Sequence, residues 1–258
     1  MDSAAAPEPG SLTPIFVFYA VCVGLPLLIA AVVVAAVLSA GPLTVALLVA
    51  VAVVLAAYLT RRRYQRVDEV LLDELDVVDA DEVEHARAYN LLEALSLRSG
   101  VAAPELYLSD DQTVNAAAIK QAGDAAAVIT AGAASRLDRL QLEGLLAEVI
   151  VRIASGDARA ATVATGMLLP FTDGPFSFLS NPATALIDRA LHPDRELGGD
   201  MAAVKLTRYP PGLRDVLSMA GQDSGAVASS TGRLWVIPPS SHPARHDLDL
   251  RLAVLTEF

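Results

Sequence analysis

Few residues in this chain have the types and spacing that hydrolysis or metal binding requires. The chain has four histidines, and no His-Glu-x-x-His motif occurs anywhere in it. His192 precedes Glu196 by one helical turn, so a metal site built from Glu148, His192 and Glu196 is one alternative. Pro193 follows this histidine directly and favours a solvated helix start instead.

The remaining candidates for chemistry lack the sequence context that they need. His242 and His246 have helical spacing, but they flank Pro243, which favours a loop and a structural or solvated role. The serines in residues 229–232 have no nucleophile-elbow motif around them. Cys22 is the single cysteine, so neither a disulfide framework nor a thiolate metal cluster can form within the chain.

The composition is that of a membrane protein. The chain has 258 residues, of which 53% are hydrophobic, and its mean hydropathy is +0.45. These values are too apolar for an ordinary soluble domain. The formal net charge is −11. We therefore expect no nucleic-acid partner, because phosphate binding needs a basic face.

Two uncharged segments near the N-terminus predict a membrane hairpin. Residues 14–38 and 43–59 carry no charged side chain, and residues 39–42 between them predict a tight turn. At about 1.5 Å per residue, each segment is long enough to cross the hydrocarbon core. A cleaved signal peptide is the alternative, but the first residues lack its positive charge. The predicted parts are a polar tail (1–13), a transmembrane hairpin (14–60) and a domain (61–258).

The basic residues beside the hairpin predict its orientation. No Lys or Arg precedes Arg61, whereas Arg61, Arg62, Arg63 and Arg66 follow the second segment directly. Positive residues near membrane segments stay on the cytoplasmic side. We therefore expect a multi-pass protein of the cell (plasma) membrane, with the lipid bilayer as a partner and with the domain and the N-terminus in the cytoplasm.

The rest of the chain has the pattern of a mainly helical domain with a few strands. Asp81 and Asp138 have the context of helix N-caps, and Gly100 that of a helix end. Short β-type runs lie at 105–109, 114–119 and 126–130, and further helices are expected at 194–207, 211–220 and 245–255.

The order of these parts resembles the HtpX-type membrane zinc metallopeptidases, which are gluzincins related to the CAAX proteases. The segments that carry the resemblance, after the hairpin, are 90–108, 115–116, 125–147, 195–200 (similar to R-E-x-x-A-D) and 241–243 (similar to T-H-P). The resemblance implies an α+β fold, with the two-helix transmembrane hairpin followed by a mainly helical zincin-like domain and a small β-sheet. It places Asn115 and Ala116 on the edge strand beside bound substrate.

The segment that matches the family's zinc helix lacks the residues that bind zinc and activate its water. The family pattern is L-E-G-x-L-A-H-E-x-x-H-x-x-x-x-D, and residues 142–157 read LEGLLAEVIVRIASGD. Glu148 and Arg152 replace the two histidine ligands, and Val149 replaces the general-base glutamate; the third ligand is retained as Glu196. Valine cannot accept a proton from a metal-bound water, and arginine has no lone pair for a metal.

Two main hypotheses of function follow. The first is a catalytically inactive pseudopeptidase without a cofactor, which binds unfolded polypeptides or membrane proteins, because an edge strand pairs with a peptide without any metal. The second is an active zinc metalloendopeptidase of membrane-protein quality control that uses substitute ligands. A purely structural subunit of a membrane complex is a third class.

The replaced positions predict a structural ion network. Glu148 precedes Arg152 by four residues on one helix face, which is the favourable order for an ion pair. If the fold follows the family, Glu196 faces the same point from a neighbouring helix. The guanidinium of Arg152 then takes roughly the zinc position between two carboxylates. The alternative is that Arg152 extends to solvent and Glu196 caps its own helix.

Overall fold

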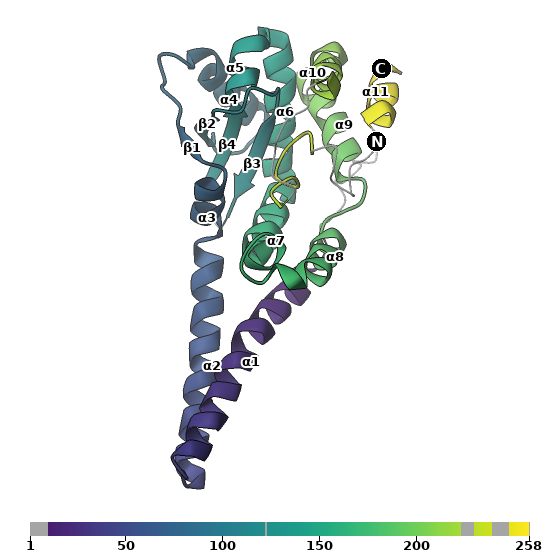
Figure 1. Cartoon of the computed structure of the whole chain (residues 1–258). Helices are drawn as coiled ribbons and strands as arrows, with labels where there is room; N and C mark the ends of the chain where they lie inside the picture. Colours follow the sequence, from purple (N-terminus) through teal and green to yellow (C-terminus); the bar gives the residue numbers. More distant parts are fainter. Residues whose placement is uncertain (1–9, 122, 223–229, 239–247, 258) are drawn as a thin grey trace.

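The computed structural model describes residues 10–121, 123–222, 230–238 and 248–257. A long helical hairpin forms one end of the molecule, and an α+β domain lies at its open end (Figure 1). This arrangement confirms the fold class expected from the sequence, a two-helix transmembrane hairpin followed by a mainly helical domain with a small sheet.

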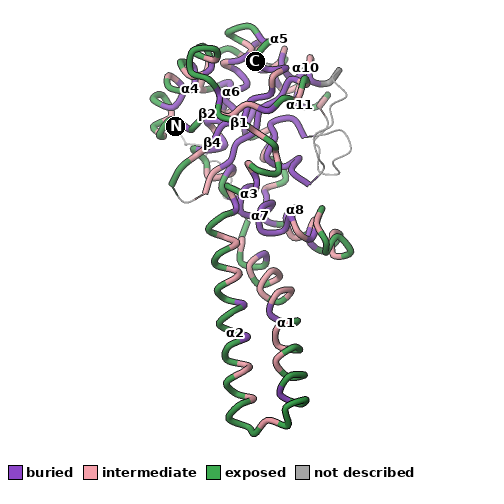
Figure 2. Tube along the Cα trace, turned by 60° about the vertical axis from the view of Figure 1, so that its left-hand side comes forward, coloured by how far each residue is buried: buried purple, intermediate pink, exposed green. Residues whose placement is uncertain are grey.

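The hairpin consists of α1 (Thr13–Val37) and α2 (Pro42–Gln65). Both helices are long and apolar enough to cross a membrane. Apart from the start of α1, most of their surface is exposed rather than packed in the protein (Figure 2). Helix α2 continues beyond residue 59 through the arginine cluster to Gln65. Arginine is a good helix former, and a positive charge is favourable in the last turn of a helix.

A close contact fixes the hairpin to the domain. Helix α3 (Val67–Glu74) follows α2 and packs on α7 (Asp157–Thr172). The Arg63 side chain donates hydrogen bonds to the carbonyl oxygen of Gly166 on α7, with an Nε–O distance of 3.0 Å. A Cβ added at Gly166 would lie 2.9 Å from the Cβ of Val67. The glycine therefore allows the two helices to approach closely.

The sheet has four strands in the order β1-β2-β4-β3. These are β1 (Val77–Asp79), β2 (Glu105–Ser109), β3 (Ala116–Lys120) and β4 (Ala125–Thr130). Strand β2 pairs with β4 in parallel, and the other two pairs are antiparallel. The prediction for 105–109 is confirmed, and the other two predicted runs differ by one or two residues at their ends. The short strand β1 was not predicted, because three residues carry too little pattern.

The remaining helices of the domain are α4 (Ala86–Ser99), α5 (Ala131–Arg136), α6 (Arg139–Ser155), α8 (Ser180–Ala190), α9 (Arg195–Thr207), α10 (Pro210–Gln222) and α11 (Leu248–Thr256), with a short 3-10 helix, η1 (Ser177–Leu179). Among these helices, α5 and α6 begin at side-chain N-caps. Asp138 caps α6 in a capping box with Gln141. Helix α4 begins after the predicted position, because the Asp81 carboxylate accepts from the backbone N–H groups of Val83 and Glu84 in the preceding turn.

Two hydrophobic cores meet at the sheet. One surrounds α6, which packs against α4, α9, α10 and β3. The other surrounds α7 and includes the start of α1. Strand β3 contributes Ala116 and Ala118 to the first core and Ala117 and Ile119 to the second. Because successive strand residues point to opposite faces, this edge strand is buried on both sides.

The contact between α6 and α10 supplies a test of the packing. A Cβ added at Gly144 on α6 would lie 2.6 Å from the backbone nitrogen of Leu213. We predict that Gly144→Ala lowers the free energy of unfolding by about 1–3 kcal/mol through overpacking. Gly198 on α9 has no neighbouring atom within 4 Å of an added Cβ. Gly198→Ala should therefore stabilise by about 0.5–1 kcal/mol. Denaturant unfolding in detergent measures both, and an unchanged Gly144→Ala contradicts the packing described.

Candidate functional site

The positions expected to form the site come together at the centre of the domain. Helix α6 supplies Glu148 and Arg152, helix α9 supplies Glu196 and Asp200, and helix α11 supplies Arg251. All five side chains are buried, and Glu148 and Asp200 are fully inaccessible. Buried charges are costly unless they are paired and hydrogen-bonded. The contacts between them therefore decide what this site can do.

Glu148 and Arg152 form an ion pair along one face of α6. The Nη2 atom of Arg152 lies 2.6 Å from Oε1 of Glu148, and its Nε atom lies 3.1 Å from the same oxygen. The guanidinium also donates to two backbone carbonyls, at 2.9 Å from the oxygen of Trp235 and 3.4 Å from that of Val236. Arg152 is only 2% exposed. The alternative in which this side chain extends to solvent is therefore wrong.

Arg251 forms the contact across the helices that was expected of Arg152. Its Nη2 atom lies 2.6 Å from Oδ1 of Asp200 and 3.3 Å from Oε2 of Glu148, and its Nε atom donates to Oδ2 of Asp200 at 2.7 Å. Its Nη1 atom donates to the carbonyl of Val236 at 3.0 Å and lies 3.9 Å from Oε2 of Glu196. The ion pair of Glu196 is thus with Arg251, because Arg152 turns towards the carbonyls of residues 235 and 236.

The sequence contains a signal for Arg251 that motif comparison does not use. Leu248, Leu252 and Leu255 have helical spacing, and Arg251 lies within the apolar face that they define. A charged residue within an apolar stripe needs a buried partner. Its partner Asp200 is the last residue of the segment that resembles R-E-x-x-A-D.

The network has an excess of negative charge. Three carboxylates face two guanidinium groups, so one negative charge remains when all are ionised. Burial raises the pKa of Glu148 above its ordinary value; Arg152 and Arg251 oppose this shift, and Asp200 adds to it. The Cβ of an alanine at position 199 would lie 3.2 Å from Oε1 of Glu148. Gly199 therefore allows α9 to lie close to this carboxylate.

A second ion pair supports the network from the side of α7. Arg195 on α9 binds Asp157 at the start of α7 through two hydrogen bonds, of 2.8 and 2.6 Å. Burial opposes ionisation of Asp157, but Arg195 and Arg152 outweigh it and hold the pKa of this carboxyl below its ordinary value. Arg195 also donates to the carbonyl of Arg233 at 2.8 Å. Asp157 is the last residue of the segment 142–157, and Arg195 is the first residue of the segment 195–200, so this ion pair joins the two segments.

The expected substrate-binding edge is occupied by the protein itself. Strand β3 is the edge of the sheet, and Asn115 directly precedes it. The segment 234–237 pairs with this edge through an antiparallel bridge between Ala117 and Trp235. Ala118 donates to the carbonyl of Leu234 at 3.2 Å, and Val236 donates to the carbonyl of Ala116 at 2.8 Å.

The Asn115 side chain completes this pairing. Its Nδ2 atom donates to the carbonyl of Ile237 at 2.8 Å, and its Oδ1 atom accepts from the Ile237 N–H at 3.1 Å. The segment's four hydrophobic residues are all buried. Edge-strand recognition of a peptide uses these same backbone groups. A peptide can pair with this part of β3 only after the segment 234–237 has been displaced from the strand.

The alternative metal site with His192 is not assembled in this structure. Nδ1 of His192 accepts a hydrogen bond from the backbone N–H of Asp194, which forms a local turn before α9. Within the described ranges, no group of three or more His, Cys, Asp or Glu side chains is arranged to hold a metal ion. His242, His246 and the segment 241–243 lie outside the described residues.

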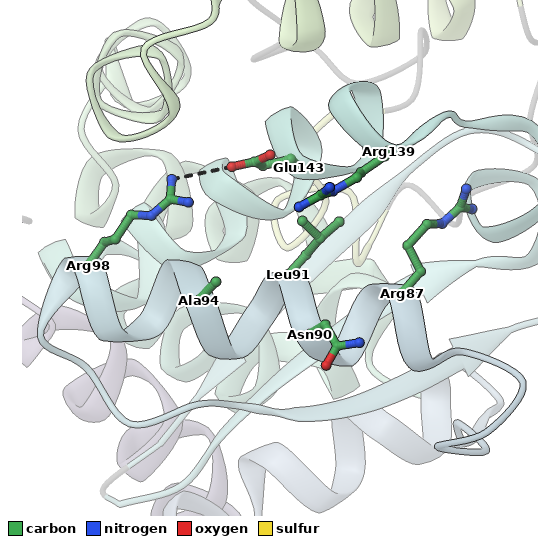
Figure 3. Close-up of a pocket in the computed structure, with 7 residues that line it drawn as sticks. All are labelled: Arg87, Asn90, Leu91, Ala94, Arg98, Arg139 and Glu143. Atoms are coloured by element: carbon green, nitrogen blue, oxygen red, sulfur yellow. Dashed lines mark hydrogen bonds and ion pairs between the residues drawn. The ribbon is translucent and has the colours of Figure 1, made fainter.

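A separate hollow lies between α4 and the first turns of α6 (Figure 3). It has a volume of about 430 Å³, and Arg87, Arg98 and Arg139 line it together with Glu143. Arg98 and Glu143 form an ion pair of 3.3 Å across it. None of its lining side chains is a histidine, a cysteine or a serine. The hollow therefore offers neither a nucleophile nor an imidazole base for hydrolysis.

The ion network predicts strong effects of single substitutions. Arg152→Ala and Arg251→Ala each leave buried carboxylates without their cation, so we expect each to lower the free energy of unfolding by about 3–5 kcal/mol. The control is Arg214→Ala, because this side chain is 41% exposed and its ion pair is with the neighbouring Asp215, which is also exposed. An exposed pair contributes about 0–1 kcal/mol. Thermal and denaturant unfolding measure the three variants, and a network variant as stable as the control would reject the coupling.

Comparison with known proteins agrees with this architecture. The chain is 28% identical to a protein named Protease HtpX homolog from Dictyoglomus thermophilum over 234 residues, which cover 75% of this chain and 77% of that protein. A protein of the same name from Dictyoglomus turgidum is 26% identical with the same coverage. One from Tropheryma whipplei is 26% identical over 66% of this chain and 72% of its own length.

No family model matches the chain, and no solved structure matches it. The relatives, the apolar hairpin and the helical domain with its small sheet nevertheless agree with one another over most of the chain. These relatives support the assignment of the chain to the HtpX-type family of membrane proteins.

Proposed function

We propose that this chain is a catalytically inactive HtpX-type protein that is anchored in the cell membrane and acts by binding polypeptide or membrane-protein partners. The observation that carries the proposal is the ion network at the family's zinc position. Two buried guanidinium groups, from Arg152 and Arg251, lie against Glu148 there. A guanidinium has no lone pair for a metal and stays protonated, so it cannot activate a water as zinc does.

The groups beside the network support the same proposal. Val149 stands where the general base is expected, and its side chain is fully buried. Hydrolysis of a peptide bond needs an activated water and a base to take its proton. Glu148, Glu196 and Asp200 supply carboxylates, but within the described residues they are not arranged to hold a metal ion as the ligands of a catalytic zinc site are. Zinc fits this set of residues poorly, and we derive no step through it.

The closed edge strand also supports the absence of proteolysis. A substrate held along β3 competes with the segment 234–237, which already binds the N–H of Ala118 and the carbonyl of Ala116. Burying a large hydrophobic side chain contributes about 1.5–3 kcal/mol. Displacing this segment therefore requires a partner that replaces several such side chains and hydrogen bonds. Ordinary unfolded substrate lacks this complementarity, so we propose that partners bind elsewhere.

The hairpin offers a surface for a membrane-protein partner. A groove of about 500 Å³ lies between α1 and α2, and small residues line much of it, among them Ala20, Gly24, Ala52 and Ala56. Small residues allow a third helix to approach closely within a bilayer. The arginines at the end of α2 support an orientation in which the domain is cytoplasmic.

Metal content and proteolysis test the loss of activity. We expect the purified full-length protein to contain no stoichiometric zinc and to leave casein and membrane-protein substrates intact. The Dictyoglomus thermophilum relative, prepared in the same way, is the comparison. Cleavage that is chelator-sensitive and lost in Glu196→Ala would overturn the proposal. For partner binding, Ala57→Leu fills the groove at an exposed position, whereas Val54→Leu alters a residue that is 68% exposed and outside it. Membrane proteins that co-purify with the wild type should be lost only with Ala57→Leu.

Reporter fusions test the orientation. Fusions after residues 10 and 258 should report the cytoplasm, and an insertion at residue 41 should report the opposite side. The reason is the arginine cluster that begins at Arg61, with no basic residue before it. A reporter that is active outside the cytoplasm when fused after residue 258 is incompatible with this topology.

A further inference from the structure

Two phenylalanines are exposed at the turn between α7 and α8. Phe176 is 48% exposed, and Phe178, within η1, is 78% exposed. Large aromatic side chains are usually buried. Two neighbouring exposed ones therefore indicate a surface that contacts a membrane or another molecule. The chain around them, from residue 174 to residue 187, contains no charged side chain. The turn therefore presents an uncharged, aromatic surface.

A chain of aromatic contacts connects this turn to the membrane hairpin. The Phe178 and Phe176 rings have centroids 6.4 Å apart, and the Phe176 ring lies 5.8 Å from that of Phe171. Phe171, near the end of α7, contacts Phe18 at 5.4 Å and Tyr19 at 5.9 Å on α1. The turn lies beside the domain end of α1 in both views (Figures 1 and 2).

The geometry of the hairpin gives the depth of this contact. Tyr19 on α1 and Arg61 on α2 are equally far along the chain from Ala40, which lies in the turn between the helices. At the rise of an α-helix, both lie about 31 Å from that turn, close to the thickness of the hydrocarbon core of a bilayer. Arg61 begins the basic cluster, which belongs at the polar surface. Tyr19, and with it Phe171, therefore lies at the membrane–water boundary.

We propose that the turn of residues 174–179 is a third membrane contact, which lies in the surface of the bilayer that the hairpin crosses. Phe176 and Phe178 insert between the headgroups and the upper acyl chains without spanning the membrane. An apolar surface of this kind lies about 5–10 Å into the headgroup boundary. Continuity with α1 selects the bilayer as the occupant, because the aromatic contacts hold the turn at the level where the lipid surface begins.

The contact also gives the domain a fixed position over the membrane. The hairpin joins the domain through α2 and α3, and the turn between α7 and α8 lies on the side of α1. Two separate contacts with one surface restrain the domain from tilting, whereas a single joint permits it. The turn is thus a positioning surface for the domain and is independent of the loss of catalysis.

A tryptophan probe tests the proposal. Phe178→Trp is placed in the full-length protein with Trp235→Phe, and the protein is reconstituted in phosphatidylcholine vesicles with a minority of phosphatidylglycerol. Phosphatidylcholine brominated near the headgroup end of the acyl chain should quench the probe several-fold more than lipid brominated near the chain end. Its emission should also shift to shorter wavelength than in a water-exposed position.

The matched control is Leu97→Trp in the same background. Leu97 is 76% exposed on α4, a helix of the domain that lies apart from the hairpin (Figure 1), and should be quenched by neither lipid. Equal quenching of the two probes, or no quenching of either, would overturn the proposal. Where Trp235→Phe impairs folding, a spin label at Phe178→Cys with Cys22→Ala gives the second measurement. Greater accessibility to oxygen than to a water-soluble nickel complex supports insertion, and the reverse order rejects it.

Discussion

The burial of Glu148 is the constraint on which the rest of the domain depends. This carboxylate lies at the centre of α6 with no solvent access, and α6 is the helix against which α4, α9, α10 and the sheet pack. A buried charge of this kind is tolerated only with opposite charges and hydrogen bonds around it. Arg152 supplies one partner from the same helix, and Arg251 supplies the other from α11. The C-terminal helix is therefore held to the domain by charge as well as by its leucines.

The same constraint explains how three helices of the domain are held together around buried charges. A zinc ion joins side chains from separate helices through its positive charge, and here guanidinium groups join α6, α9 and α11 in the same manner. The difference lies in the coordination sphere. A catalytic zinc keeps an open position for water, whereas the hydrogen bonds of Arg152 and Arg251 end on carboxylates and on the carbonyls of Trp235 and Val236. The network therefore holds the helices together, and the hydrogen bonds of both guanidinium groups are directed at oxygen atoms of the protein.

Local signals in the sequence predicted several elements of the fold, but not β1, α5, α7 or α8. The contacts at the site depend on tertiary structure. Asp138 is the N-cap of α6, and Gly100 is the C-cap of α4. Both roles depend on a few neighbouring residues, and both are found as expected. The spacing of Glu148 and Arg152 is local as well, so their pairing could be read from the helix alone. Arg251 lies far from Asp200 along the chain, and only the packing of α11 on α9 brings them together. The pairing of the segment 234–237 with β3 has the same origin, because four hydrophobic residues in a row fit several structures equally well.

The ion network and the occupied edge strand form one unit. Arg152 donates to the carbonyls of Trp235 and Val236, and Arg251 donates to the second of these. On its other side, the segment pairs with β3 and with Asn115. The backbone of residues 234–237 thus has hydrogen bonds to the sheet on one edge and to the guanidinium groups on the other. A segment that joined only the sheet could be exchanged for any strand of similar shape, but the two arginines require carbonyl oxygens at defined positions. The two arginines of the ion network therefore also fix the chain segment that pairs with the edge strand.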